Sequence, residues 1–292
     1  MIATAVKTGA ERLLLAKTGE KVIIRSTEPV GGGCINSCYK IISTHGTYFL
    51  KYNDRKRYPN MFAAEANGLT HLAKANAIKV PDVIGCGEEG DYTFLLMEFI
   101  EKGAFTKDFF YQFGVGLAKL HRTSNDAFGF KENNYIGSLV QSNSWTKNGI
   151  DFFIEQRLAP QLAKAYDKGY FAKEILKHFD RLFIKLPEII PAERPALLHG
   201  DLWNGNYLIT AQGQACLVDP AVYFGFREQD IAMTRLFGGF DDDLYVGYES
   251  EFALEKGWPE RIDIFNLYPL LVHVNLFGEG YAMQVFGIIK KF

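Results

Sequence analysis

The 292-residue sequence lacks several features that would assign it to a large class of proteins. It has four cysteines and no Cys-x-x-Cys pair, so we expect no zinc site. Basic residues are not in excess, because 32 Lys and Arg stand against 34 Asp and Glu. Proteins that bind nucleic acid or a membrane surface need a basic face, so we expect neither as a partner.

Long apolar runs are also missing. Residues 1–24 contain short apolar clusters broken by charges and do not form a secretory signal. The most apolar stretch, residues 264–289, is interrupted by polar residues such as Asn266, His273 and Glu279, and is predicted to be a buried helical region. Without an export signal, we expect a cytoplasmic protein whose thiols are reduced.

Apolar and aromatic residues are plentiful. Hydrophobic residues make up 48% of the chain, and 24 Phe and 15 Tyr are available to fill a core. This is an ordinary globular composition, and the length allows one large domain or two modest ones.

Strand patterns are concentrated in the first hundred residues. Residues 1–24 carry helix-like spacing, and residues 26–29 are rich in turn formers. The remaining predictions for this part are a strand, glycine turn and strand over 30–42, a strand over 47–52, a helix over 61–75 and a strand over 92–97.

Helical patterns dominate beyond a candidate boundary near Gly103. Helices are predicted over 109–121, 151–166 and 171–186, short strands near 207–209 and 215–218, and mostly helix from residue 228. We therefore predict an α+β fold with two lobes. Residues 1–100 would form an N-terminal lobe with an antiparallel sheet plus helix, and residues 101–292 a mainly helical C-terminal lobe.

The strongest chemical signal is the loop His199-Gly200-Asp201-Leu202-Trp203-Asn204-Gly205-Asn206, followed by a hairpin and Asp219. Asp-x4-Asn, a hairpin and then Asp is the spacing of phosphotransferases of the protein-kinase type. There, one carboxylate orients and deprotonates the attacking hydroxyl, while an Asn oxygen and a second carboxylate hold magnesium on the nucleotide phosphates. The alternative is a surface turn, because Asp, Asn and Gly are common turn residues.

Features upstream favour the phosphotransferase. The run Gly31-Gly32-Gly33 lies between predicted strands, where bare backbone amides can approach phosphate oxygens. Lys51 follows on a strand, and Glu65 lies 14 residues later in a helix, where it can pair with Lys51. Each residue alone is weak evidence. Their order, followed by the Asp-x4-Asn loop and Asp219, is the argument.

At His199–Asn206 the sequence resembles the fructosamine kinases, or ketosamine-3-kinases, which are relatives of aminoglycoside phosphotransferases with a protein-kinase-like fold. The matching stretches span nearly the whole chain. They read VGGGCINSCYKI, FLKYN, LLMEFI, HGDLWNGN, VDPAVYFGFREQDIAM, FGGFDDDLYVGYE and LVHVNLFGEGY.

The resemblance implies ATP and Mg2+ as cofactors and a role for each matching residue. Asp201 would be the catalytic base acting on a sugar hydroxyl. Asn206 and Asp219 would bind the magnesium ion. Trp203 and Asn204 would line the acceptor pocket, although Trp203 could equally be a packing residue.

Further residues would bind the nucleotide or support the loop. Lys51 would hold the phosphates with Glu65 as its partner, and the segment Glu98-Phe99-Ile100 would offer backbone groups to the adenine. Residues 1–100 would thus be the nucleotide-binding lobe, and residues 101–292 the catalytic and substrate-binding lobe. His199 and Asp230 would brace the catalytic loop without touching the substrate.

The motifs depart from those of protein kinases, because His-Gly-Asp and Asp-Pro-Ala replace His-Arg-Asp and Asp-Phe-Gly. These departures argue against a protein hydroxyl as the acceptor. The substrate that the resemblance implies is a ketosamine such as a fructosamine or ribulosamine, either a small molecule or an adduct on a protein lysine. Phosphorylation at the sugar O3 would lead to deglycation. Two alternatives stay open: a kinase of another small alcohol or amino-sugar, and a non-catalytic nucleotide-binding regulator.

Cys34 is a redox candidate, because it directly follows the glycine run. An electropositive loop would lower its pKa and raise its reactivity. We expect either a monomer or a redox-dependent homodimer. The other three cysteines are predicted to be small core residues.

Overall fold

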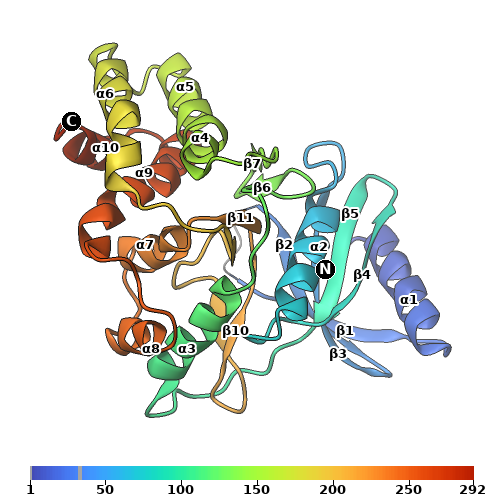
Figure 1. Cartoon of the computed structure of the whole chain (residues 1–292). Helices are drawn as coiled ribbons and strands as arrows, with labels where there is room; N and C mark the ends of the chain where they lie inside the picture. Colours follow the sequence, from blue (N-terminus) through green and yellow to red (C-terminus); the bar gives the residue numbers. More distant parts are fainter. Residues whose placement is uncertain (1, 32–34) are drawn as a thin grey trace. The chain divides into compact units, whose positions relative to one another are not determined.

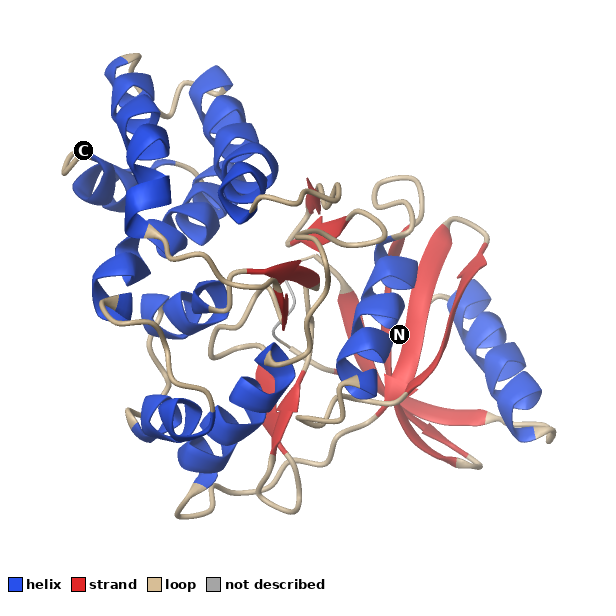
Figure 2. Cartoon of the chain, viewed as in Figure 1, coloured by secondary structure: helices blue, strands red, loops and turns tan. Residues whose placement is uncertain are grey.

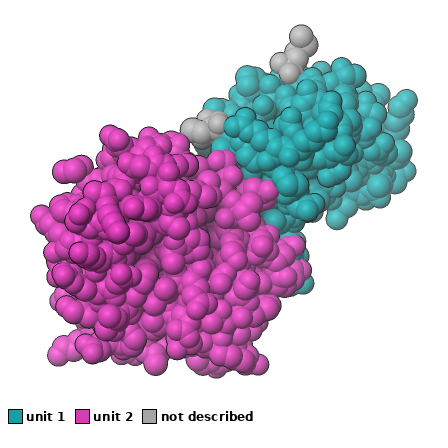
Figure 3. All heavy atoms as spheres, turned by 90° about the horizontal axis from the view of Figure 1, so that it is seen from above, with its two compact units in different colours: residues 1–109, 207–219 teal, residues 110–206, 220–292 magenta. Residues whose placement is uncertain are grey.

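The computed structural model describes residues 2–31 and 35–292. The chain divides into two compact units (Figure 3). Unit 1 comprises residues 1–109 and 207–219, and unit 2 comprises residues 110–206 and 220–292. The chain therefore leaves unit 2 after Asn206 and returns to it after Asp219.

Unit 1 is built on an antiparallel five-stranded sheet in the order β1-β2-β3-β5-β4 (Figure 1). Its strands are β1 (Ile24–Pro29), β2 (Ser37–Ser43), β3 (Gly46–Asp54), β4 (Val83–Glu89) and β5 (Tyr92–Glu98). Its helices are α1 (Thr4–Thr18) and α2 (Met61–Lys74).

The two faces of this sheet differ in what they contact. Neighbouring residues of a strand point to opposite faces, so Leu50 and Lys51 of β3 face opposite ways. Leu50 belongs to the core that Val6, Ala10 and Leu14 of α1 complete. Lys51 points to the other face, where its ammonium group meets Glu65 of α2. The α1 face is therefore an apolar core, and the α2 face carries a buried charge.

A hairpin from later in the chain completes unit 1. Strands β9 (Tyr207–Ile209) and β10 (Ala215–Leu217) pair with each other. The amide of Leu217 donates to the carbonyl of Lys79 at 2.9 Å, and the amide of Gly103 donates to that of Ile209 at 3.0 Å. These bonds fix the hairpin to unit 1 and carry Asp219 with it.

Unit 2 is mainly helical (Figure 2). Its helices are α3 (Phe109–His121), α4 (Gly149–Phe152), the π-helix η1 (Phe153–Leu158), α5 (Ala159–Asp167), α6 (Glu174–Ile189), α7 (Glu228–Leu236), α8 (Asp243–Glu251), α9 (Trp258–Phe277), the 3-10 helix η2 (Glu279–Tyr281) and α10 (Ala282–Ile289). Its strands form two short antiparallel pairs, β6 (Asn134–Ile136) with β7 (Leu139–Gln141), and β8 (Ala196–Leu198) with β11 (Tyr223–Gly225).

Helix α9 is the buried centre of unit 2 and packs against α5, α7 and α10. The apolar stretch at 264–289 therefore lies in α9, η2 and α10, which confirms the predicted helices. The predicted burial holds mainly for α9, because Met283 and Phe286 of α10 are exposed. In the described part of the chain, no helix is both long and apolar enough to span a membrane.

A pair of glycines brings α3 and α8 together. A Cβ atom on Gly114 would lie 1.9 Å from the carbonyl oxygen of Leu244, and one on Gly247 would lie 2.1 Å from that of Tyr111. Any larger residue would push the helices apart. This close approach places the last residue of α3, His121, beside Tyr248 of α8.

The predicted α+β class is confirmed, with the antiparallel sheet and its helices in unit 1 and a mainly helical unit 2. The short strands β6, β7, β8 and β11 of unit 2 were not predicted, and two strands of the unit 1 sheet differ from the sequence predictions. Residues 26–29, predicted as a turn, belong to β1, and β4 was not predicted. Both are edge strands, so β1 is largely exposed and shows no hydrophobic alternation.

The prediction that three cysteines are core residues holds only for Cys216, which is buried. Cys86 is exposed on the edge strand β4, and Cys38 is half-buried on β2. Burial raises the pKa of the Cys38 thiol to about 11 although the Lys51 ammonium opposes this, so the thiol is unreactive near neutral pH.

Candidate active site

Lys51 joins two carboxylates in unit 1. Its ammonium donates to Glu65 Oε1 at 2.7 Å and also to Asp219 Oδ1. The Lys51 side chain is only 3% exposed, whereas that of Asp219 is 49% exposed. The triad therefore has a buried cation between two acids, of which Glu65 is mostly buried and Asp219 can be reached by solvent.

The charges of the triad support one another. Burial alone would lower the pKa of Lys51, but the carboxylates of Asp219 and Glu65 outweigh burial and hold that pKa above its usual value. Burial also raises the pKa of Glu65, against the effect of Lys51. Lys51 is therefore a permanent positive charge at the position where the sequence predicts phosphate binding.

Asp219 has an unusual backbone. Its φ is +55°, in the left-handed region that residues other than glycine seldom adopt. It follows β10 and precedes Pro220. The tight turn at this point aims the carboxylate at Lys51.

The predicted catalytic loop of unit 2 is closed by its own hydrogen bonds. The amide of Trp203 donates to the carbonyl of Asp201 at 3.1 Å, and the amide of Asn206 donates to the carbonyl of Trp203 at 3.0 Å. The Asn206 side-chain nitrogen donates to the Asp201 carbonyl at 2.8 Å and to its Oδ2 at 2.9 Å. The five-residue spacing between Asp201 and Asn206 thus brings their side chains together.

Gly200 is required by the geometry of this loop. Its φ is +82°, and a Cβ atom would lie 2.1 Å from the carbonyl oxygen of Ala221. The backbone of the loop passes directly over the segment that follows Asp219, and a side chain at this position would force the two apart.

Asp230 lies beneath the loop as a buried acceptor. It accepts hydrogen bonds from the amides of His199 at 2.7 Å and Gly200 at 2.9 Å, and from His121 Nε2 at 3.2 Å. Burial would raise the pKa of Asp230, but the hydrogen bond from His121 and the charges around it hold that pKa below its usual value. In turn, His199 Nδ1 accepts from the Asp201 amide at 3.2 Å.

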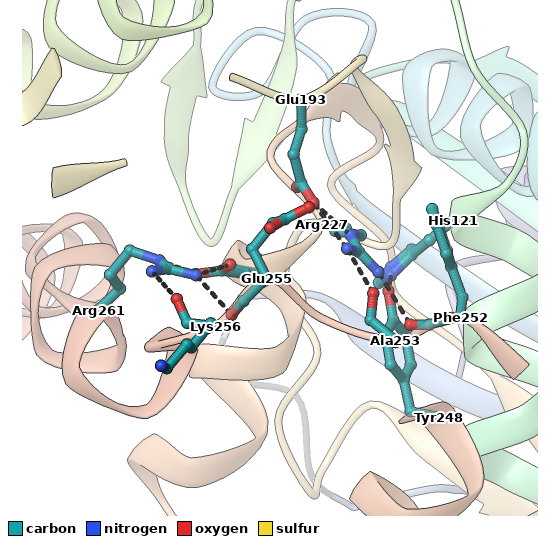
Figure 4. Close-up of polar contacts among 10 residues, drawn as sticks. His121, Glu193, Arg227, Tyr248, Phe252, Ala253, Glu255, Lys256 and Arg261 are labelled. Carbon is teal, nitrogen blue, oxygen red and sulfur yellow. Dashed lines mark hydrogen bonds and ion pairs between the residues drawn. The ribbon is translucent and has the colours of Figure 1, made fainter. Parts of the chain in front are cut away.

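The sequence analysis missed His121 and Tyr248. His121 Nδ1 lies 2.8 Å from the Tyr248 hydroxyl, and both side chains are buried. Figure 4 shows this pair beside Arg227, which binds Glu193 and the carbonyls of Phe252 and Ala253. No sequence motif marks these residues, because each looks like an ordinary helix or loop position.

The two residues predicted for the acceptor pocket lie on the outer part of the loop. Trp203 is 37% exposed and meets the Phe237 ring edge-on, with centroids 6.3 Å apart. Gly205 allows the indole to approach, since a Cβ atom there would lie 2.3 Å from it. Asn204 packs over Gly239, which has no side chain to block it.

The segment predicted to contact adenine ends β5. The Glu98 amide donates to the Asp82 carbonyl at 2.8 Å, and its carboxylate accepts from Lys79 at 2.8 Å. The Phe99 ring lies under the ammonium of Lys40, and Ile100 is buried.

Of the predicted glycine run, Gly31 is exposed, and no atom of the described residues other than its chain neighbours lies within 4 Å of the position of an added Cβ. Gly32, Gly33 and Cys34 lie outside the described residues.

The predicted residues thus form two clusters. Lys51, Glu65 and Asp219 meet in unit 1, and the loop from His199 to Asn206 closes over Asp230 in unit 2. Asn206 and Asp219, the predicted magnesium ligands, flank the two points where the chain passes between units. Their roles, and the division of function at residue 100, stay predictions.

The chain is similar to known proteins over nearly its whole length. The family model described as Fructosamine kinase matches residues 6–292. A protein of Enterococcus faecium named as a probable ketoamine kinase is 40% identical over 266 residues, which cover 90% of this chain and 94% of that protein.

Two further relatives extend the comparison. The chloroplastic protein-ribulosamine 3-kinase of Oryza sativa subsp. indica is 35% identical over 94% of this chain and 80% of its own length. The crystal structure of a Haemophilus somnus protein named as a fructosamine-3-kinase superposes with a TM-score of 0.88. It has 30% sequence identity and covers 97% of this chain and 96% of that chain.

Proposed function

This chain belongs to the fructosamine kinase family, and from that membership we propose that it is an ATP-dependent kinase of ketosamines. It transfers the terminal phosphoryl group of ATP to a hydroxyl of a sugar joined to an amine. The observation that carries the proposal is the closed loop in which Asn206 holds the carboxylate of Asp201. Such a carboxylate is oriented to receive a hydroxyl proton.

The triad of unit 1 supports the nucleotide half of the proposal. Lys51 is buried and stays protonated, so it can neutralise phosphate oxygens, and Glu65 fixes the position of its ammonium. We assign the adenine to the backbone of Glu98-Phe99-Ile100. With Gly31, these residues belong to the nucleotide-binding part, which we place in residues 1–100.

Asn206 and Asp219 suit magnesium in their chemistry. Magnesium prefers oxygen donors and takes one or two from protein, together with phosphate oxygens and water. The Asn206 side-chain nitrogen is engaged by Asp201, which leaves its oxygen as the donor to a cation. When bound, the ion supplies charge neutralisation on the phosphates. No group of three or more His, Cys, Asp or Glu among the described residues forms an all-protein metal cage.

Most of the rate enhancement comes from positioning. Asp201 aligns the acceptor hydroxyl with the phosphoryl group and takes its proton as the bond forms. Asp230 and His199 hold the loop backbone, so the carboxylate is presented in one orientation. Trp203 and Asn204 are the proposed contacts to the sugar.

The acceptor hydroxyl is assigned as O3 of a fructosamine or ribulosamine, and the product then leads to deglycation. The resemblance to a protein-ribulosamine 3-kinase favours an adduct on a protein lysine in addition to free ketosamines. We also propose a cytoplasmic protein that is a monomer or a redox-dependent homodimer.

A substrate panel tests this function. Purified protein is incubated with ATP and magnesium and offered ribulosamines, fructosamines, aminoglycosides and choline, and ADP formation and the phosphorylated product are both measured. We expect turnover on the ketosamines alone, with product carrying phosphate on O3. Turnover confined to an aminoglycoside or choline would reassign the substrate, and no turnover with any acceptor would favour a nucleotide-binding regulator.

A further inference from the structure

Arg157 differs from the other buried arginines of the chain. In the described ranges, 2–31 and 35–292, three arginine side chains are buried: Arg157, Arg227 and Arg261. Arg227 pairs with Glu193 and Arg261 with Glu228, and each also binds backbone carbonyls (Figure 4). Arg157 is fully buried, and no carboxylate in those ranges forms an ion pair with it.

The guanidinium of Arg157 is bound by neutral groups. It donates to the carbonyls of Ser142 at 2.6 Å and Gln156 at 3.0 Å, and to Asn143 Oδ1 at 2.6 Å, while its Nε has no hydrogen-bond partner among the described residues. A buried cation without an acid is costly unless its surroundings compensate for the lost hydration. The surroundings of Arg157 must therefore offset the free-energy cost of burying its charge.

Aromatic rings provide that compensation. The guanidinium lies 3.9 Å from the centroid of Tyr223, 4.6 Å from that of Phe152 and 5.4 Å from that of Tyr268. The faces of aromatic rings attract cations, and more strongly away from water. Tyr223 is therefore fixed on one side by a charge.

On its other side, Tyr223 reaches the catalytic loop. A Cβ atom on Gly200 would lie 3.1 Å from Tyr223 Cε1, so the ring edge abuts the backbone that precedes Asp201. A cavity of about 20 Å³ lies against the same backbone and is lined by Gly200, Tyr223 and Asp230 among others. Tyr223 is therefore one of the side chains that line the small space beside the loop.

Side-chain amides fix the residues just before Tyr223. Asn143, which binds Arg157, donates to Asn134 Oδ1 at 3.0 Å. Asn134 donates to the carbonyl of Val222 at 2.8 Å, and Gln141 donates to that of Ala221 at 3.1 Å. The ring of Tyr223 and the backbone leading to it are thus held by one network that includes the buried cation.

We propose that Arg157 is a positioning residue for phosphoryl transfer, which fixes Tyr223 against Gly200 and so fixes the carboxylate of Asp201. The inference rests on the proposed kinase function. Charge supports the geometry: burial raises the pKa of Tyr223 to about 12, Arg157 opposes this, and Asp230 and Asp201 add to it. The Tyr223 hydroxyl therefore senses the charge of Arg157 and the charges of both loop acids.

The test compares kcat, KM and Tm of Arg157→Met and Arg157→Lys with those of the wild type. Misplacement of a reacting group by about 1 Å costs about 10²-fold, so we expect Arg157→Met to lower kcat by up to about that factor. KM for ATP should stay unchanged, because the triad that binds phosphate is in unit 1. Arg157→Lys keeps a cation near Tyr223 and should restore most of kcat.

Arg261→Met is the matched control, since it also removes a buried arginine from unit 2. It should lower Tm without changing kcat of the folded enzyme. If Arg157→Met behaves in the same way, Arg157 has only a structural role and the inference is wrong.

A second pair of variants decides the question if Arg157→Met does not fold. Tyr223→Phe keeps the ring and should keep most of kcat, whereas Tyr223→Leu removes it and should lose kcat with KM for ATP unchanged. Equal kcat values for these two variants would also overturn the inference. An inactive wild-type enzyme on the whole substrate panel would instead refute the kinase function itself.

Discussion

The two clusters of acidic residues are stabilised in different ways. In unit 1, Glu65 and Asp219 are held by a charged side chain, Lys51. In unit 2, Asp230 is held by the backbone amides of His199 and Gly200 and by the side chain of His121. The cluster around Lys51 consists of ion pairs, whereas in the cluster around Asp230 the acid accepts hydrogen bonds from main-chain amides.

The difference corresponds to the chemistry proposed for each cluster. Ion pairs can exchange partners, so an ammonium that binds Asp219 can turn to a phosphate when ATP arrives. Bonds from backbone amides cannot exchange without unfolding the loop. The first arrangement suits a site that must bind and release a nucleotide, and the second suits the support of a loop whose base, Asp201, must not move.

Removing the base should give the largest effect. Asp201→Asn keeps the shape of the loop but cannot accept the hydroxyl proton, so we expect kcat to fall by about 10³-fold or more. Nucleotide affinity should change little, because the triad is intact. The measurement is ADP formation on a ketosamine, with ATP affinity from calorimetry. Exposed Asp241→Asn is the control, and kcat within about tenfold of wild type in Asp201→Asn would contradict the assignment.

Breaking the ion-pair cluster should affect both binding and stability. Lys51→Met removes the proposed phosphate contact and leaves Glu65 buried without its cation, which costs about 3–5 kcal/mol of unfolding free energy. The loss of a preorganised donor lowers kcat/KM for ATP by about 10²–10³-fold. Denaturant unfolding and initial rates measure the two effects.

A double variant separates these two effects. Lys51→Met combined with Glu65→Met removes the unpaired acid, so it should recover most of the stability and none of the activity. Recovery of activity in the double variant would show that Lys51 does not bind phosphate.

Breaking the backbone cluster should lower kcat and alter the acid stability of the protein. Asp230→Asn weakens the bonds to the His199 and Gly200 amides, and we expect kcat to fall by about 10–10²-fold with KM for ATP unchanged. A rise in that KM without a change in kcat would place Asp230 in the nucleotide site.

The acid dependence follows from the lowered pKa of Asp230. A carboxyl whose folded pKa is depressed stabilises the protein above its unfolded pKa, near 3.9, and loses that contribution as pH falls through the folded value. The Tm difference between wild type and Asp230→Asn should therefore be largest near neutral pH and should shrink below about pH 4. A difference that stays constant down to pH 3 would mean that Asp230 is not charged.

An exposed ion pair should give the smallest effect. Arg55 and Glu88 lie 3.0 Å apart in unit 1, with both side chains more than 40% exposed. Replacing both with alanine should cost about 0–1 kcal/mol and leave kcat unchanged, since water screens the pair. A cost near that of Lys51→Met would show that burial is not what makes the triad strong.

Several contacts of the candidate active site could be predicted because their residues are close in sequence or common to a family. The Asp201–Asn206 spacing places both side chains in one tight loop. The order of Lys51 and Glu65 predicts a strand and a helix, and the predicted contact between them is confirmed. The hairpin strands near 207–209 and 215–218 are confirmed as β9 and β10.

The supporting residues could not be predicted because they come from distant segments. His121 reaches Asp230 across 109 residues of sequence, and its neighbours on α3 give no sign of a polar contact. In the sequence, Arg157 looks like an exposed residue on an amphipathic helix. In the structure it lies in the π-helix η1 and is buried, and its guanidinium binds Ser142 and Asn143, which follow β7. Tertiary packing, which no local pattern records, decides both cases.

The left-handed backbone of Asp219 has a cost in folding free energy. A residue with a Cβ atom in that conformation costs about 1 kcal/mol, and glycine would remove the cost. Asp219→Gly would relieve this cost but would also remove the carboxylate that meets the buried Lys51, so the backbone conformation and the ion pair act in opposite directions on stability. A screen for stabilising substitutions should therefore keep the aspartate at this turn, because its carboxylate meets Lys51.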